Sequence, residues 1–135
     1  MTDVHTSQQR SFNMSSVRNK NTRPEKLVRS TLHNLGYRFC LHSEKLPGKP
    51  DIILPKWNLI IFVHGCFWHQ HKGCKKAVRP QSNEPFWDKK LDENIRRDGA
   101  IVTKLRRSGW RVAIIWECET MDKNFPLKLK KLVEW

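Results

Sequence analysis

The segment that decides the fold is WNLIIFV, residues 57–63, an almost continuously apolar run with several β-branched and aromatic side chains. A short run of this composition predicts a strand that is buried on both faces, with helices covering each side of its sheet. The apolar run Ile52-Ile53-Leu54 precedes it, and Pro55-Lys56 lies between the two. We therefore expect these segments to pair as a tight hairpin.

Helical patterns lie on both sides of this hairpin in the sequence. Residues 22–25 read TRPE, which has the form of a capping box, and the apolar stripe that follows ends at Gly36, so a helix of about three turns is expected. From Phe86 to Arg107 the apolar residues keep helical spacing. Residues 126–135 suggest a short, amphipathic, basic helix.

The remaining segments complete an α/β fold. Residues 37–41 and 110–116 are predicted as strands, which gives a central mixed β-sheet flanked by helices. Because 135 residues suffice for one domain of ordinary size, we expect a single domain at residues 21–135. Residues 1–20 are polar and basic and are interpreted as an N-terminal arm, although a disordered tail has the same composition.

The charge of the chain predicts a polyanionic partner. It contains 26 Lys and Arg residues against 13 Asp and Glu residues, for a formal charge of +13. Nucleic acid is the leading candidate, with an anionic membrane surface as the alternative. No apolar run reaches the roughly 20 residues that span a bilayer, and the N-terminus has no secretory signal pattern. We therefore expect a cytoplasmic protein with no membrane segment.

Four cysteines are present, and three of them, together with a histidine, are candidate metal ligands. Cys66, His71 and Cys74 lie within nine residues, and Cys118 follows a predicted strand. Three thiolates and one imidazole form a closed, tetrahedral set that is typical of structural zinc. Unlinked core cysteines are the alternative interpretation. Cys40 lies in an alternating strand pattern, is expected to be a small buried residue, and is left out of the zinc set.

A carboxylate and a histidine are expected at one edge of the sheet. Asp51 precedes the first strand of the hairpin, and the second strand ends at Val63-His64. A carboxylate at this position needs a hydrogen bond, a counter-charge or a metal ion, and a simple turn cap is the plainer interpretation. With an imidazole beside it, the pair is typical of a site that combines a hard cation with a general base.

Two further groups belong to the same candidate site. His69 lies outside the predicted zinc set and is a candidate base for activating water. Asp98 is predicted on the apolar face of the long helix, where a buried acid needs a partner. His64 is the expected partner, and a buried ion pair with Arg96 or Arg97 is the alternative.

Adjacent aromatic residues occur in basic, turn-rich segments. Phe67-Trp68 and Phe86-Trp87 have basic neighbours and lie outside the predicted strands. Core packing is the default role of such side chains. Rings in basic loops are also suited to stacking on bases or inserting between them, which we favour for Phe67 and Trp68. Met14 of the arm is a further candidate wedge.

The sequence resembles the bacterial very-short-patch mismatch-repair endonucleases. The resemblance rests on FVHGCFWH at residues 62–69, LPGKPD at 46–51, WEC at 116–118, RSFNM at 10–14 and TRPE at 22–25. It extends over nearly the whole chain and implies a restriction-endonuclease-like fold. The implied activity is magnesium-dependent hydrolysis of one strand of double-stranded DNA, 5′ of the thymine in a T·G mismatch.

The resemblance also implies a biological context. T·G mismatches arise when 5-methylcytosine deaminates, which implies a functional link to a cytosine-5 DNA methyltransferase. The enzyme would act on DNA of the bacterial nucleoid. Nicking one strand at one mismatch requires only a monomer, so a monomer is expected.

The resemblance assigns roles to individual residues. Asp51 corresponds to the magnesium ligand, with the backbone carbonyl of Val63 as a second ligand. The residues that correspond to catalytic groups are Asp51, His69 as general base, His64, Asp98 and Glu25. The residues that correspond to the ligands of a structural zinc ion are Cys66, His71, Cys74 and Cys118. The residues that correspond to side chains inserted into the DNA are Met14, Phe67, Trp68 and Trp87.

The sequence departs from the family pattern at three points. Val63 stands where the family pattern has a threonine, and the loop between His71 and Cys74 is one residue longer than in that pattern. The acid and lysine that restriction enzymes carry on the second strand are replaced by Val63 and His64, so catalysis is expected to depend on histidine. There are two alternative interpretations. The chain could be a zinc-stabilised DNA-binding module without catalysis, or a basic RNA-binding protein.

Overall fold

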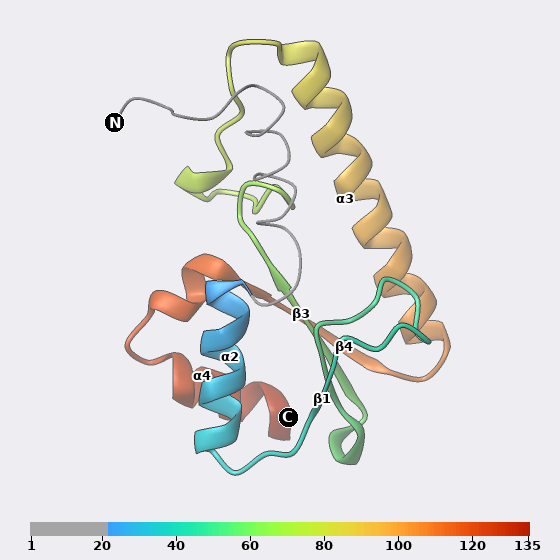
Figure 1. Ribbon diagram of the computed structural model, residues 1–135, viewed down its shortest axis with the longest axis vertical. Helices are drawn as coiled ribbons and strands as arrows, with labels where there is room; N and C mark the ends of the chain where they lie inside the picture. Colours follow the sequence, from blue (N-terminus) through green and yellow to red (C-terminus); the bar gives the residue numbers. More distant parts are fainter. Residues whose placement is uncertain (1–21) are drawn as a thin grey trace.

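The structure is a computed structural model that describes residues 22–135; the arm expected at residues 1–20, including Met14, lies outside the described residues. A four-stranded sheet with the order β1-β2-β3-β4 lies at its centre. The strands are β1 (Cys40–Leu41), β2 (Ile52–Leu54), β3 (Leu59–His64) and β4 (Arg111–Trp116). The helices α2 (Arg23–Asn34), α3 (Glu84–Arg107) and α4 (Phe125–Glu134) surround this sheet (Figure 1).

The sheet is mixed, as the sequence pattern predicted. β1 pairs with β2 and β2 pairs with β3 in antiparallel orientation, and the short 3-10 helix η1 (Pro55–Trp57) closes the expected β2–β3 hairpin. β3 and β4 are parallel, from Leu59 opposite Arg111 to His64 opposite Trp116. α3 provides the crossover between them, as a parallel pair requires.

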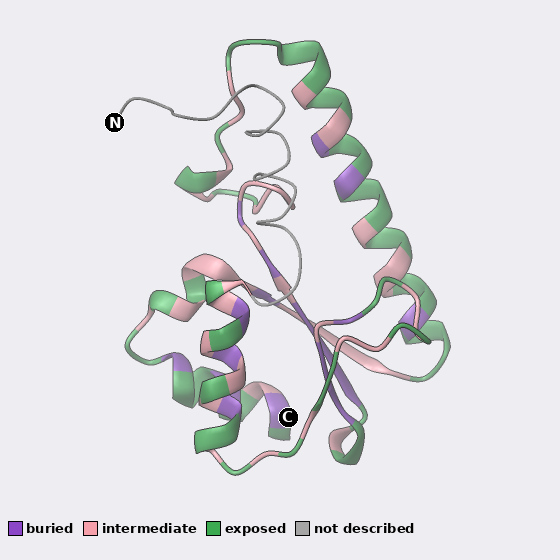
Figure 2. Cartoon of the chain, in the orientation of Figure 1, coloured by how far each residue is buried: buried purple, intermediate pink, exposed green. Residues whose placement is uncertain are grey.

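Helices cover both faces of the sheet, which explains the nearly unbroken apolar sequence of β3. Alternate residues of a strand point to opposite faces. Leu59 and Ile61 pack with α2 and α4 in one buried cluster, whereas Ile60 and Phe62 pack in a second cluster that includes Leu105 of α3. Figure 2 shows the buried residues concentrated along β3 and on the inward sides of the helices.

Two predicted strands differ from expectation. The strand expected at residues 37–41 contains only Cys40 and Leu41, and both are exposed, so the expectation of a buried Cys40 is wrong. β4 is half-buried apart from Ile115, although its apolar sequence suggested a fully buried strand. Both strands lie at the edges of the sheet, where a strand has one neighbour instead of two. Among the described residues, no helix is long and apolar enough to cross a membrane.

Arg111, the first residue of β4, joins the hairpin to the C-terminal helix. Its guanidinium donates hydrogen bonds to the backbone carbonyl of Trp57 (2.9 and 3.2 Å) and to that of Val133 (2.8 Å). Val133 lies in the last turn of α4, where carbonyl groups have no partner within the helix. The positive charge also complements the helix dipole at this end.

Replacing Arg111 by methionine is expected to destabilise the fold by about 1–3 kcal/mol, because two carbonyl groups in a half-buried site lose their donors. Chemical denaturation of the wild type and of Arg111→Met measures the difference. Arg107→Met is the matched control, since Arg107 is exposed at the end of α3. Equal stability of the two variants would contradict this role of Arg111.

Candidate active site and zinc centre

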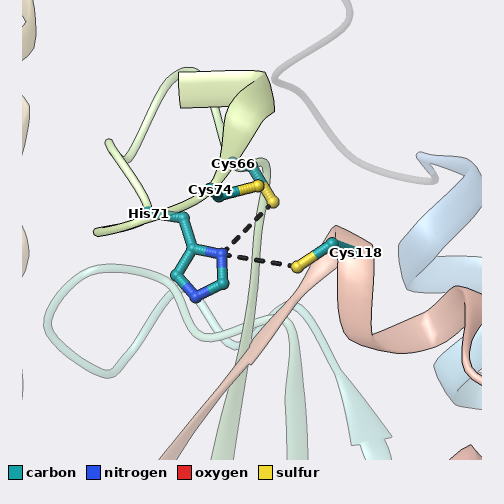
Figure 3. Close-up of side chains that lie close together, drawn as sticks. All are labelled: Cys66, His71, Cys74 and Cys118. Carbon is teal, nitrogen blue, oxygen red and sulfur yellow. Dashed lines mark hydrogen bonds between the residues drawn. The ribbon is translucent and has the colours of Figure 1, made fainter. Parts of the chain in front are cut away.

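Four potential zinc ligands meet beyond the ends of β3 and β4. Cys66, His71 and Cys74 come from the loop after β3, and Cys118 comes from η3 (Glu117–Met121), which directly follows β4 (Figure 3). Their ligand atoms all lie within 4.8 Å of one another. The sequence-predicted set is therefore assembled in space by elements far apart in the chain.

The distances in this cluster fit a tetrahedral zinc ion. Nδ1 of His71 lies 3.4 Å from Sγ of Cys118 and 3.7 Å from Sγ of Cys66. Zinc bonds of about 2.3 Å to sulfur and 2.0–2.1 Å to nitrogen place these atoms about 3.5 Å apart in a tetrahedron. Burial raises the pKa of the Cys66 thiol to about 12. A bound cation would stabilise the thiolate that coordination requires.

Asp51 is anchored at the start of β2. Its Oδ2 accepts a hydrogen bond of 2.8 Å from the backbone N–H of Val63. Burial, reinforced by the nearby carboxylate of Glu25, raises the pKa of Asp51 to about 6, although the Val63 hydrogen bond acts in the opposite direction. The hairpin thus holds a carboxylate in a site where its charge is costly and a cation would be favourable.

His69 forms an acid–imidazole pair with the long helix. Its Nδ1 lies 2.5 Å from Oδ2 of Asp98, which projects from α3. The carboxylate therefore accepts a hydrogen bond from Nδ1–H and leaves Nε2 as the proton acceptor, the tautomer that a general base needs. From the sequence, Asp98 was expected to pair with His64, or else with an arginine; in the structure its imidazole partner is His69.

His64 supports this pair by stacking. Its ring lies 3.8 Å from that of His69 between centroids, at an interplanar angle of 8°. Burial lowers the pKa of His64 to about 3, with a smaller contribution from His69, so His64 is neutral at physiological pH. Among the described residues, its buried Nδ1 has no hydrogen-bond partner. His64 is therefore suited to positioning the His69 ring.

Glu25 and His42 complete the carboxylate side of the site. Glu25 lies in the first turn of α2, is 2% exposed, and contacts Nε2 of His42 through Oε1. Their ligand atoms lie within 4.8 Å of a carboxylate oxygen of Asp51. His42 was not among the residues predicted from the sequence. Only the pairing of Leu41 with Ile52, which is seen in the structure, places residue 42 opposite Asp51.

These groups share one cavity of about 430 Å³. Its lining includes three carboxyl groups, the three histidines described above and two cations: Glu44, Asp51, Asp98, His42, His64, His69, Lys49 and Arg97. The Asp51 carboxylate and the His69 imidazole therefore face the same space. Such a convergence is typical of metal-assisted hydrolysis.

The predicted DNA-inserting aromatics form a separate cluster. Phe67 lies 5.2 Å from Trp68 and 5.5 Å from Trp87, and Phe86 lies 5.3 Å from Trp87, measured between ring centroids. Phe67, Trp68 and Trp87 are half-buried, and Phe86 is 53% exposed. The rings support one another at the surface, outside the two buried clusters of the sheet.

Polar side chains fix the loop that carries two of these rings. Gln70 donates a hydrogen bond to the carbonyl of Phe67 (2.7 Å), and Asn94 of α3 donates one to the carbonyl of Trp68 (3.1 Å). Arg79 in turn holds Oε1 of Gln70 at 3.0 Å. These supporting residues were not predicted from the sequence, because local spacing does not reveal which loops contact α3.

Comparison with known proteins reveals close similarity to nicking enzymes. The family model described as DNA mismatch endonuclease Vsr matches residues 2–76. The type II nicking enzyme V.XorIIP of Xanthomonas oryzae is 50% identical over 122 residues, which cover 90% of this chain and 89% of that protein. DNA mismatch endonuclease Vsr of Escherichia coli is 39% identical over 118 residues, or 87% and 75% of the two chains. The resemblance found in the sequence is thus confirmed.

Replacing Asp51 by asparagine is expected to stabilise the metal-free protein at pH 7.5 by an amount on the order of 2 kcal/mol. The pKa of Asp51 is raised from 3.8 to about 6, so its neutral form favours folding below pH 4 and this contribution is lost as the pH rises through 6. Asparagine stays neutral throughout.

Thermal melts in magnesium-free buffer between pH 7.5 and pH 4.5 measure this effect. The advantage of Asp51→Asn should be largest at pH 7.5 and shrink as the solution becomes more acidic. An equal or lower melting temperature of the variant at pH 7.5 would show that Asp51 carries no burial cost.

Removing one cluster thiol is expected to abolish zinc binding. Elemental analysis should find roughly one equivalent of zinc in the wild type and none in Cys118→Ser, and the variant should melt several degrees lower, because metal binding contributes to folding. Cys40→Ser is the control, since Cys40 is exposed and outside the cluster. Full zinc content in Cys118→Ser would exclude Cys118 as a ligand.

Proposed function

Because the chain belongs to the Vsr family of DNA mismatch endonucleases and is a DNA-nicking enzyme, we propose that it nicks double-stranded DNA 5′ of the thymine in a T·G mismatch. The observation that carries this proposal is the shared cavity in which Asp51 faces the His69–Asp98 pair. A binding module would have no use for an oriented base beside a buried carboxylate.

The carboxylate side of the cavity fits a magnesium ion. Mg²⁺ prefers oxygen ligands, and carboxylate oxygens of Asp51 and Glu25 lie within 4.8 Å of each other. Their mutual repulsion contributes to the raised pKa of Asp51, and a cation relieves it. Asp51 and the backbone carbonyl of Val63 are the proposed ligands, with Glu25 beside them. When bound, magnesium neutralises charge on the scissile phosphate and on the leaving oxygen.

His69 is the proposed general base. Asp98 fixes its Nδ1 proton, and the neutral ring of His64 stacks against it, so Nε2 is held ready to accept a proton from the attacking water. No lysine is needed for this step. The departure from the restriction-enzyme pattern at Val63 and His64 is therefore compatible with hydrolysis.

The aromatic cluster supports selection of a mismatch. Phe67, Trp68 and Trp87 are held together at the surface by a loop anchored to α3, which favours insertion of rigid rings into a duplex. Unstacking costs least where base pairing is already weak. Preference for a T·G step then follows partly from the deformability of the DNA.

The wider proposal follows from the same family membership. We propose a restriction-endonuclease-like fold, a structural role for zinc, and a monomer acting on nucleoid DNA in the bacterial cytoplasm. A single catalytic domain at residues 21–135 would be preceded by a DNA-binding arm at residues 1–20 that carries Met14. A cytosine-5 DNA methyltransferase would generate the sites at which T·G mismatches arise.

Strand-specific nicking of end-labelled duplexes tests this proposal. The set contains each mismatch in several sequence contexts, because relatives are named as type II nicking enzymes. We expect magnesium-dependent cleavage 5′ of the thymine at T·G, and a loss of rate of about 10²–10⁴-fold in His69→Ala with DNA binding retained.

His33→Ala is the matched control, because His33 is exposed on α2 and does not belong to the candidate active site. Cleavage of perfectly paired DNA at the same rate as T·G duplexes would contradict the mismatch substrate. A wild-type rate in His69→Ala would contradict the assignment of the base.

A further inference from the structure

His42 contacts Glu25 and lies near Asp51, yet the proposed mechanism gives it no role. Its side chain is 15% exposed and lines the active-site cavity. Nε2 contacts Oε1 of Glu25, and the ligand atoms of His42, Glu25 and Asp51 all lie within 4.8 Å of one another. An imidazole nitrogen is therefore directed to the place where the two carboxylates converge.

The backbone at His42 is held in an unusual conformation. Its φ is +47°, in the left-handed region that residues other than glycine seldom adopt. The N–H of His42 donates to the carbonyl of Asp51 at 3.2 Å, which continues the β1–β2 pairing by one residue. Such strain persists only where surrounding contacts enforce it, and it is concentrated at functional sites. Here it turns the imidazole toward Glu25.

The three side chains have the composition of a mixed metal site. Two carboxylates and one imidazole suit borderline divalent transition metals, whereas Mg²⁺ prefers oxygen ligands alone. An octahedral ion with bonds of about 2.1 Å holds neighbouring ligand atoms about 3 Å apart and opposite ones about 4.2 Å apart. The ligand atoms of the three residues lie within 4.8 Å of one another, and Nε2 of His42 would have to move apart from Oε1 of Glu25 to admit the ion between them.

We propose that His42 is a nitrogen ligand of the catalytic metal site, so that the site binds a transition-metal ion such as Mn²⁺ more tightly than Mg²⁺. This inference rests on the proposed function only in placing the metal beside Asp51 and Glu25. The competing role for His42 is to position Glu25 by a hydrogen bond without touching the ion. A glutamine at this position distinguishes the two roles. Its amide N–H still donates a hydrogen bond to Glu25, but the side chain offers no imidazole nitrogen to the metal ion.

Metal binding by the zinc-loaded protein distinguishes these roles without any nicking assay. Mn²⁺ is titrated into wild type and His42→Gln while electron paramagnetic resonance detects the free ion, and Mg²⁺ is then added as competitor. We expect the preference for Mn²⁺ over Mg²⁺ to fall about tenfold in His42→Gln. Pulsed measurements on bound Mn²⁺ should show coupling to an imidazole nitrogen that disappears in the variant.

Three variants make the result interpretable. His33→Gln is the matched control and should behave as wild type, whereas Asp51→Asn should lose Mn²⁺ binding at this site. If His42→Gln lowers the melting temperature, His42→Asn provides a second replacement, because asparagine tolerates the left-handed backbone conformation. An unchanged Mn²⁺ preference and an unchanged nitrogen coupling in both His42 variants would overturn the proposal.

Nicking assays on the same samples keep the two proposals separate. T·G cleavage by the wild type together with unaltered metal preference in the variants would leave the proposed function standing and exclude His42 as a ligand. Altered metal preference without mismatch cleavage would support the metal site and reject the proposed substrate.

Discussion

The parallel pairing of β3 with β4 is the constraint on which both candidate centres depend. It places His64 opposite Trp116 at the carboxyl ends of adjacent strands. The loop that leaves β3 carries three zinc-ligand candidates and the proposed base His69, while η3 after β4 carries Cys118. Because α3 must cross over to make this pairing parallel, the same connection brings Asp98 to the active site.

The two centres are also connected by ring contacts. The ring of His71 stacks on Trp116 at 4.3 Å, Trp116 meets His64 edge-on at 5.3 Å, and His64 stacks on His69. Asp98 ends this row by binding His69. A zinc ion that fixes His71 thereby restrains the packing behind the proposed base, which gives a structural metal a direct bearing on catalytic geometry.

The candidate site concentrates groups that are costly in the metal-free fold. Asp51 is buried near Glu25, and its ionised form is disfavoured at neutral pH. His64 stays neutral because burial lowers its pKa to about 3, and among the described residues its buried Nδ1 has no hydrogen-bond partner. Such groups are expected where a substrate phosphate and a cation complete the electrostatics.

The sequence by itself determined the order of elements, the central hairpin and the local group Cys66, His71 and Cys74 of the candidate zinc set, because apolar periodicity and ligand spacing are local properties; Cys118 joins this group only in the fold. It also predicted Asp51 and His69 as candidate site residues, from their positions in the sequence and from the resemblance to a family. Tertiary structure decided that Asp98 pairs with His69, that Cys40 is exposed, and that His42 reaches Glu25. These outcomes depend on strand register and on the path of α3 across the sheet, which bring together side chains 17 to 29 positions apart. No local pattern encodes distances of that kind.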